Sequence, residues 1–347
     1  MNLPDYNFLS TPLWLITILQ ILTLTLHLTA MNFLVGGIIV VLWGRLTDRW
    51  QTPAVQSLAR MLPTATAATI TLGVAPLLFV QLVYPRHVYS ASIVSAWFWL
   101  MIPVAVAVAY YLFYGASFAK NALKRPTLFY TIAGICLLYV SFVYSSVFSM
   151  AEHPADVKEL YASSQSGLVI NSNLSDYVFR WLHILLAAPV VGGFAAGLIG
   201  RDDPTAFSVG KKLLLWGMIG TSVFGLFYLL TLGDILAPFM RSPGIWILVP
   251  GILLAFAGLH FYFKRRFVPS GLALLASVLA MVTSRHYLRL IHLYYDPRAL
   301  TIAMPSWTVT PQWSVFVLFL ILIVIAILAL IWLLRMVFSN RGASQGE

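Results

Sequence analysis

The chain has 347 residues, of which 60% are hydrophobic and 9% are charged, and its formal net charge is +10. This composition excludes an ordinary soluble domain and is typical of a protein that crosses a membrane several times. The one cysteine, Cys136, lies within an apolar stretch, which excludes a disulfide framework and cysteine-based metal sites.

Nine apolar stretches of about 20 residues or more predict nine transmembrane helices, so the predicted fold class is an all-α membrane protein. In chain order the predicted helices cover Leu13–Trp43, Leu62–Tyr84, Val94–Ala119, Leu128–Met150, Tyr177–Gly200, Leu213–Leu232, Ile245–Phe263, Ser270–His292 and Trp313–Met336. The first stretch lacks the basic flank and the cleavage site of a signal peptide, so we expect it to remain as a helix.

Most of the 21 lysines and arginines lie on one side of the predicted membrane. They follow the odd-numbered predicted helices, in clusters that begin at Arg45, Lys120, Arg201 and Lys264. The positive-inside rule then places the N-terminus outside and the C-terminus in the cytoplasm. The net charge reflects this topology, so we expect the lipid bilayer, and no nucleic acid, as its partner.

Two similar stretches each place a histidine nine residues before a glycine pair. The first is LHLTAMNFLVGG, with His27 and Gly36–Gly37, and the second is LHILLAAPVVGG, with His183 and Gly192–Gly193. A histidine within an apolar span indicates a functional site, and glycines leave room for a flat ligand or for another helix. A lone histidine would be a hydrogen-bonded core residue, but the repetition favours two ligand positions for a metal or haem.

Other short strings also repeat in the same order. Thr71–Gly73 corresponds to Thr231–Gly233, and Trp99–Pro103 corresponds to Trp246–Pro250. These matches predict two parallel four-helix repeats followed by one helix, an arrangement that transporters also use. The predicted domains are residues 1–155 for repeat one, residues 156–300 for repeat two, and residues 301–347 for the ninth helix and a cytoplasmic tail.

His286, in the eighth predicted helix, is expected at a depth similar to that of His183. We predict that these two histidines hold one iron from opposite sides. Repeat one has no histidine at the corresponding position, near Val143 and Tyr144. His27 is therefore expected to hold a five-coordinate haem at a separate centre, or to share a site with repeat two.

Arg180, Arg285 and Arg289 are predicted at the same level as these histidines. An arginine within the membrane needs an anion. The candidates are Asp176, Asp234, Asp296, lipid headgroups and haem propionates. Because the guanidinium fork suits a carboxylate well, we expect these arginines to bind the cofactor. Snorkelling to the outer interface is the alternative for Arg180 and Arg289.

The remaining histidines are weaker ligand candidates. His87 and His153 fall in predicted outer loops, where we expect them to be solvated. His260 lies one turn before Lys264 near the inner surface, and we expect no ligand role for it. His292 is at the outer end of its helix and ranks second to His286 because it is shallow.

The repeated histidine and glycine pair, Leu72–Val74 and the four-plus-four-plus-one arrangement resemble subunit I of cytochrome bd-type quinol oxidases. The resemblance extends over most of the chain and is best in Leu24–Gly37, Thr69–Tyr84 and Tyr177–Gly193. It implies haems near the outer face, with His27 on the oxygen-reactive haem and His183 on a low-spin haem b.

The chain departs from that family in four places. Ile245–Phe263 has no methionine to ligate the low-spin haem, and the Gly-Arg-Gln-Pro-Trp signature of the family is missing. The quinol-binding loop is reduced to the short segment Asp234–Gly244, and no glutamate occurs in any predicted span.

These features together predict a haem b cytochrome with one or two haems, in the inner membrane of a bacterium. It would pass electrons between quinone and a redox protein at the outer face, such as a c-type cytochrome, within a respiratory complex with other membrane subunits. Outer aromatic residues would line a quinone pocket or form an aromatic belt: Trp181, Tyr287, Tyr294 and Tyr295. The alternatives are a haem-free transporter or structural subunit, and a divergent oxygen-reducing quinol oxidase.

Overall fold

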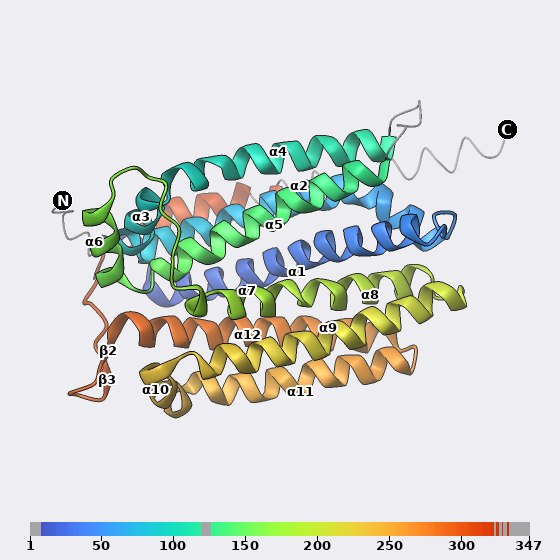
Figure 1. The fold of residues 1–347 in the computed structure, drawn as a ribbon. Coiled ribbons are helices and arrows are strands. Elements are labelled where there is room, and N and C mark those ends of the chain that lie inside the picture. Colours follow the sequence, from blue (N-terminus) through green and yellow to red (C-terminus); the bar gives the residue numbers. More distant parts are fainter. Residues whose placement is uncertain (1–7, 119–125, 323, 326–327, 329–331, 333–347) are drawn as a thin grey trace. The chain divides into compact units, whose positions relative to one another are not determined.

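The computed structural model describes residues 8–118, 126–322, 324–325, 328 and 332. The chain forms two compact units, one of residues 17–304 and one of residues 1–16 with residues 305–347. In the smaller unit, β1 (Phe8–Leu9) pairs in parallel with β4 (Thr308–Val309). The larger unit holds the helices that carry all the predicted ligands (Figure 1).

Eight segments within the described residues are long and apolar enough to cross a membrane, which confirms an all-α, multi-pass membrane protein. They are α1 (Leu13–Leu46), α2 (Pro53–Val83), α4 (Ala96–Phe118), α5 (Pro126–Met150), α7 (Val178–Leu185) continued by α8 (Ala187–Ile199), α9 (Pro204–Leu230), α11 (Pro243–Phe263) and α12 (Phe267–Tyr294). Of the predicted ninth helix, Trp313–Leu322 is a shorter apolar helix, and much of the remainder lies outside the described residues.

Four of these helices begin at a proline: Pro53, Pro126, Pro204 and Pro243. Proline suits the first helical position because its fixed φ is helical and no partner is needed there for the missing N–H. In α9 the side chain of Asp203 also accepts a hydrogen bond from the Thr205 N–H, at 2.8 Å. The apolar runs predicted later starts, because the first residues of these helices are proline, glycine, alanine or polar residues and not large apolar ones.

The predicted fifth helix is broken between α7 and α8 at Leu186, three residues after His183. Pro189 lies in the first turn of α8, where its ring opposes the carbonyl of Leu185 and where it has no N–H to donate. The break therefore has a local cause, and it makes α7 a separate short helix that carries His183.

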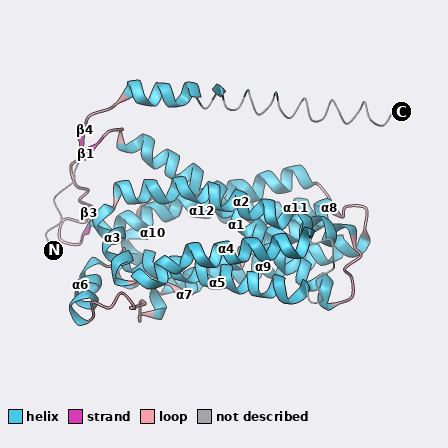
Figure 2. Ribbon diagram, turned by 90° about the horizontal axis from the view of Figure 1, so that it is seen from above, coloured by secondary structure: helices cyan, strands magenta, loops and turns pink. Residues whose placement is uncertain are grey.

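Short elements collect at one end of the larger unit, which we call the Glu152 end. They are α3 (Pro85–Val94), α6 (Pro154–Ser163), η1 (Leu174–Asp176), η2 (Gly233–Ile235), α10 (Leu236–Arg241) and the hairpin of β2 (Tyr295–Asp296) with β3 (Thr301–Ile302). The opposite end, called the basic end, carries Arg45, Arg201 and Lys264. Figure 2 shows that helices make up nearly all the regular structure between these ends.

The helices α1 and α8 cross in direct backbone contact at Gly36 and Gly192. A Cβ atom on Gly192 would lie 2.5 Å from the Gly36 carbonyl oxygen, and a Cβ atom on Gly36 would collide with the Ala188 carbonyl oxygen. The sequence left open whether these glycines make room for a flat ligand or for another helix. The structure shows that they make room for another helix.

The second glycine of each pair also faces protein. A Cβ atom on Gly37 would lie 3.0 Å from a methyl group of Leu62, and one on Gly193 would lie 2.6 Å from the Gly210 carbonyl oxygen. The Tyr262 hydroxyl donates to the Gly193 carbonyl at 3.0 Å. All four glycines predicted to bind a cofactor therefore make helix contacts in this structure.

The α1–α8 crossing generates the first prediction. Gly36→Ala and Gly192→Ala should each lower the free energy of unfolding by at least about 1–3 kcal/mol, because the added methyl group overpacks two backbones. Gly134→Ala is the control, since its Cβ atom would meet only Ile38, at 3.6 Å. Thermal unfolding in detergent measures the effect, and equal melting temperatures for all three variants would contradict it.

Candidate functional site

The two repeated histidines make the same hydrogen bond to a neighbouring helix. The Nδ1 atom of His27 lies 3.0 Å from the Thr69 carbonyl oxygen on α2, and that of His183 lies 2.8 Å from the Thr221 carbonyl oxygen on α9. Since a carbonyl can only accept, Nδ1 carries the proton and donates, which leaves the Nε2 lone pair basic. Metal-binding histidines are oriented in this way.

A glycine lies beside each of these imidazole rings, four residues after the threonine. A Cβ atom on Gly73 would lie 2.7 Å from Cε1 of His27, and one on Gly225 would lie 2.7 Å from Nδ1 of His183. Both rings therefore need glycine where they approach the adjacent helix.

The predicted match between Gly73 and Gly233 is wrong. Gly233 lies outside the long helices at φ 53°, with nothing within 4 Å of its Cβ position. The glycine whose environment matches that of Gly73 is Gly225, because both face a histidine ring.

The two histidines lie at similar heights but in different places. Each precedes its crossing glycine by nine residues, or about 13.5 Å of helix, and α1 and α7–α8 run in the same direction (Figure 1). His27 faces α2, whereas His183 faces α9. The arrangement fits two separate centres.

His286 differs from the other two predicted ligands. Its Nδ1 atom is buried and has no hydrogen-bond partner among the described residues, and its ring meets Tyr287 edge-on at 5.8 Å. An unpaired buried polar atom costs about 1–3 kcal/mol. His286 therefore has an unused ring nitrogen, as a ligand for a cofactor requires.

The three predicted intramembrane arginines converge on Glu152, which was not among the anions that we expected from the sequence. Arg180 Nη1 donates to its Oε2 atom at 3.0 Å, Arg285 Nη2 donates to the same carboxylate, and Arg289 Nε donates at 3.4 Å. Glu152 is only 5% exposed. We call Glu152 and these three arginines the Glu152 cluster.

The Glu152 cluster carries more positive than negative charge. Burial alone would raise the pKa of the Glu152 carboxyl, but Arg285, Arg180, His292 and Arg289 together hold this pKa well below its ordinary value. The carboxylate stays ionised, so it acts as an anchor and not as a proton donor. One carboxylate faces three guanidinium groups, and the buried Nη1 atom of Arg285 has no hydrogen-bond partner in the part of the chain that the structure describes.

A narrow cavity adjoins the cluster, with Tyr84, His87, Phe148 and Arg289 in its lining. Tyr294, predicted as a rim residue, stacks on Tyr84 at 6.4 Å and meets His87 edge-on at the same distance. Burial lowers the pKa of His87, and the charge of Arg86 lowers it further.

The prediction that His87 and His153 are solvated is wrong, because α3 and α6 fold these residues back against the bundle. His87 is half-buried, and its Nδ1 atom has no hydrogen-bond partner within the described ranges. The Nδ1 atom of His153 lies 2.9 Å from the Ser149 carbonyl, and its ring meets His292 at 5.4 Å. His260, by contrast, is exposed on α11.

Sequence reasoning missed Thr69, Thr221, Gly225 and Glu152. The first three had a usable signal, because TITLG and TSVFG both place a glycine four residues after a threonine in the helix that follows a histidine. Glu152 lies two residues beyond α5, and nothing in the sequence around it distinguishes it from an ordinary loop acid.

No three His, Cys, Asp or Glu side chains within the described residues are grouped to hold a metal ion. A haem needs only one or two axial ligands from the protein, which single histidines can supply. The bonded Nδ1 atoms, the glycines beside the rings and the unpaired nitrogen of His286 are consistent with such ligands.

Comparison with protein-family models, with curated proteins and with solved structures gave no match to this chain. The resemblance to subunit I of bd-type oxidases therefore stays a prediction from the residues quoted for it.

The Glu152 cluster generates the second prediction. Glu152→Gln should lower the free energy of unfolding by about 3–5 kcal/mol, because it leaves three buried cations without their counter-charge. Thermal unfolding in detergent would show the loss, and adding Arg285→Gln to this variant should recover part of it. Glu159→Gln, at an exposed position on α6, is the control. If Glu152→Gln had the same melting temperature as the wild-type protein, the Glu152 cluster would not be an anchor.

Proposed function

We propose that this protein is a membrane-embedded haem b cytochrome that passes electrons between quinone and a redox partner at the outer face. The observation that carries the proposal is the repeated setting of His27 and His183. Each histidine donates from Nδ1 to a threonine carbonyl, keeps Nε2 for another partner, and rests against a glycine. A purely structural histidine does not need this combination at two related positions.

In this proposal His27 would hold one haem, and His183 and His286 would together hold a second. When bound, haem supplies one-electron redox chemistry, whose potential depends on the axial ligands and on burial. The carbonyls of Thr69 and Thr221 keep each imidazole in the tautomer that presents Nε2. The matching settings also support two related four-helix halves.

The Glu152 cluster fits the proposal through its charge. Arg180 is one turn from His183, and Arg285 is adjacent to His286. Three guanidinium groups share one carboxylate, so the cluster can accept further anionic oxygens. Haem propionates have that chemistry, and the planar fork of arginine binds a carboxylate with two parallel hydrogen bonds.

We propose that the quinone binds at the Glu152 end of the bundle. The cavity beside Tyr84, His87 and Arg289 has a volume of about 10 Å³, which is room for one water molecule and not for a quinone headgroup, so it is not that site. The Glu152 end faces outward if the positive-inside rule holds, which agrees with an electron partner outside a bacterial inner membrane. Companion membrane subunits and an outer c-type cytochrome complete the proposal.

The main alternative, a haem-free transporter, is disfavoured by the Glu152 cluster. Alternating access moves one group of helices against another. Glu152, next to α5, is bound to arginines on α7 and α12, so such a movement would separate buried charges. The paired histidine settings would also have no role in transport.

The proposal predicts non-covalent haem in the purified protein. Full-length protein in detergent should show b-type bands after reduction with dithionite, and pyridine haemochrome analysis should find at least one haem for each chain. Intact, correctly melting protein without haem would rule out the cytochrome assignment.

The assignment of ligands is tested by single substitutions. His183→Ala and His286→Ala should each abolish the same low-spin signal, because both would ligate one iron, whereas His27→Ala should remove a separate signal. His260→Ala, at an exposed position, is the control and should leave both signals unchanged. Reduced optical spectra and electron paramagnetic resonance measure these outcomes. If His286→Ala spared the low-spin signal, the pairing would be wrong while the haem assignment could stand.

A further inference from the structure

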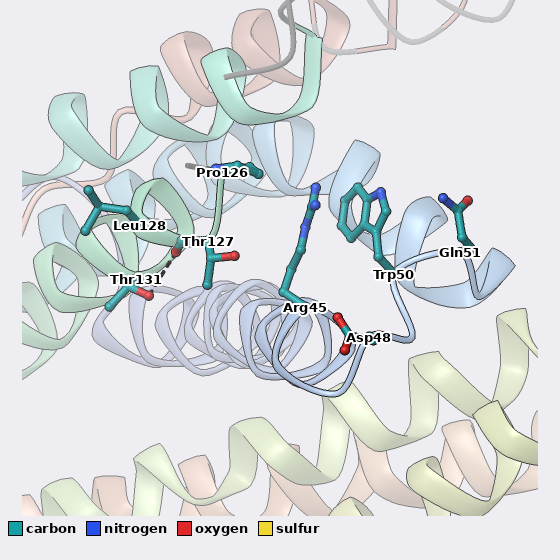
Figure 3. A pocket seen from close by; sticks show the side chains of 8 residues that line it. All are labelled: Arg45, Asp48, Trp50, Gln51, Pro126, Thr127, Leu128 and Thr131. Carbon is teal, nitrogen blue, oxygen red and sulfur yellow. Dashed lines mark hydrogen bonds between the residues drawn. The ribbon is translucent and has the colours of Figure 1, made fainter. Parts of the chain in front are cut away.

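A hollow of about 710 Å³ lies at the basic end, between the end of α1, the turn into α2 and the start of α5 (Figure 3). Arg45, Asp48, Trp50, Gln51 and Thr127 are among the side chains that line it. Its size is within the range of about 300–1,000 Å³ that is usual for small-molecule sites.

Arg45 is held in this hollow by an aromatic ring. Its Cζ atom lies 3.1 Å from the centroid of the Trp50 ring, and Figure 3 shows its side chain extending between Trp50 and Thr127. Among the described residues, the buried Nε atom has no hydrogen-bond partner and Arg45 forms no ion pair with a carboxylate. The stacked guanidinium group is therefore oriented, but its charge is not neutralised by a nearby acid.

Asp48 places a carboxylate in the lining of the same hollow. Asp48 follows the end of α1 and has a φ of 56°. The N–H of the next residue, Arg49, donates a hydrogen bond to the Gly44 carbonyl at 2.8 Å. Aspartate tolerates this left-handed conformation better than most residues do. The hollow therefore offers one positive and one negative side chain that are not paired with each other in the described structure.

We infer that the hollow binds the headgroup of an aminophospholipid, with the phosphodiester on the Arg45 guanidinium and the ammonium group on the Asp48 carboxylate. The hydroxyl of Thr127 and the amide of Gln51 supply further hydrogen bonds. A headgroup with one negative and one positive charge complements this pair, whereas an anionic headgroup would meet repulsion from Asp48.

The position of the hollow agrees with a lipid as the occupant. Arg45 is in the last turn of a helix that is long enough to cross the membrane, and Trp50 follows that helix by four residues. Tryptophan and arginine at this level are typical of the bilayer surface, and basic pockets between helices bind lipid headgroups. The inference does not depend on haem, so either proposal can fail alone.

Native mass spectrometry of delipidated full-length protein tests the inference, with short-chain phosphatidylethanolamine and phosphatidylglycerol added separately. The wild-type protein should bind the ethanolamine lipid more tightly. Arg45→Gln should weaken the binding of both lipids by about tenfold or more, as expected for the loss of a charged hydrogen bond. Asp48→Asn should weaken ethanolamine lipid binding and strengthen glycerol lipid binding. Arg49→Gln, which is exposed and outside the hollow, should match the wild-type protein.

Melting temperatures close to that of the wild-type protein would show that each variant is folded, and asparagine keeps the backbone conformation of residue 48 accessible. A wild-type preference for phosphatidylglycerol, or an Asp48→Asn variant with unchanged preference, would overturn the inference. Displacement of bound lipid by millimolar inorganic phosphate would also overturn it, because the site would then be one for free phosphate.

Discussion

A buried carboxylate with three arginines around it fixes the arrangement of the helices at the Glu152 end. Charges within an apolar bundle are tolerated only when they are paired and hydrogen-bonded. Glu152 meets this requirement for arginines on α7 and α12, so it joins the end of α5 to two helices from the other half of the chain. Because Arg180 is one turn from His183 and Arg285 is adjacent to His286, the same carboxylate also fixes the level of two candidate ligands.

A second constraint acts deeper in the bundle, where Gly36 and Gly192 bring α1 and α8 into backbone contact. Lipid tails are as apolar as leucine, so helices in a bilayer associate through close packing, and small residues permit it. The crossing relates equivalent residues of the two histidine stretches. The Gly36–Gly192 crossing therefore sets His27 and His183 at similar heights in the bundle. The carbonyl groups on α2 and α9 determine the direction in which each imidazole ring donates its hydrogen bond.

The sequence predicted the long helices well, because a helix that crosses the membrane needs about 20 consecutive apolar residues and this is a local property of the sequence. The break between α7 and α8 also has a local cause, because Pro189 can be read directly from the sequence. Glu152 could not be placed in the same way. Its burial depends on arginines 28 to 137 residues away in the chain, and nothing near it distinguishes it from a loop acid. The sequence could not decide whether the glycine pairs contact a ligand or another helix, because only the folded chain shows which surface faces them.

The sequence predicts two related halves, and a difference between them bears on the proposed chemistry. In the second half, His286 offers an imidazole whose buried Nδ1 atom has no hydrogen-bond partner among the described residues. In the first half, the region predicted to correspond to it holds Tyr144, whose ring packs against Trp99 at 4.8 Å and stacks with Phe148 at 5.8 Å. An aromatic cluster cannot supply a second axial nitrogen. If both histidines hold haem, His27 would share its iron with a weaker ligand or none, and the two centres would differ in potential because axial ligation sets it. Such a difference would give an electron a direction of travel between two sites that the helices otherwise hold in matching positions.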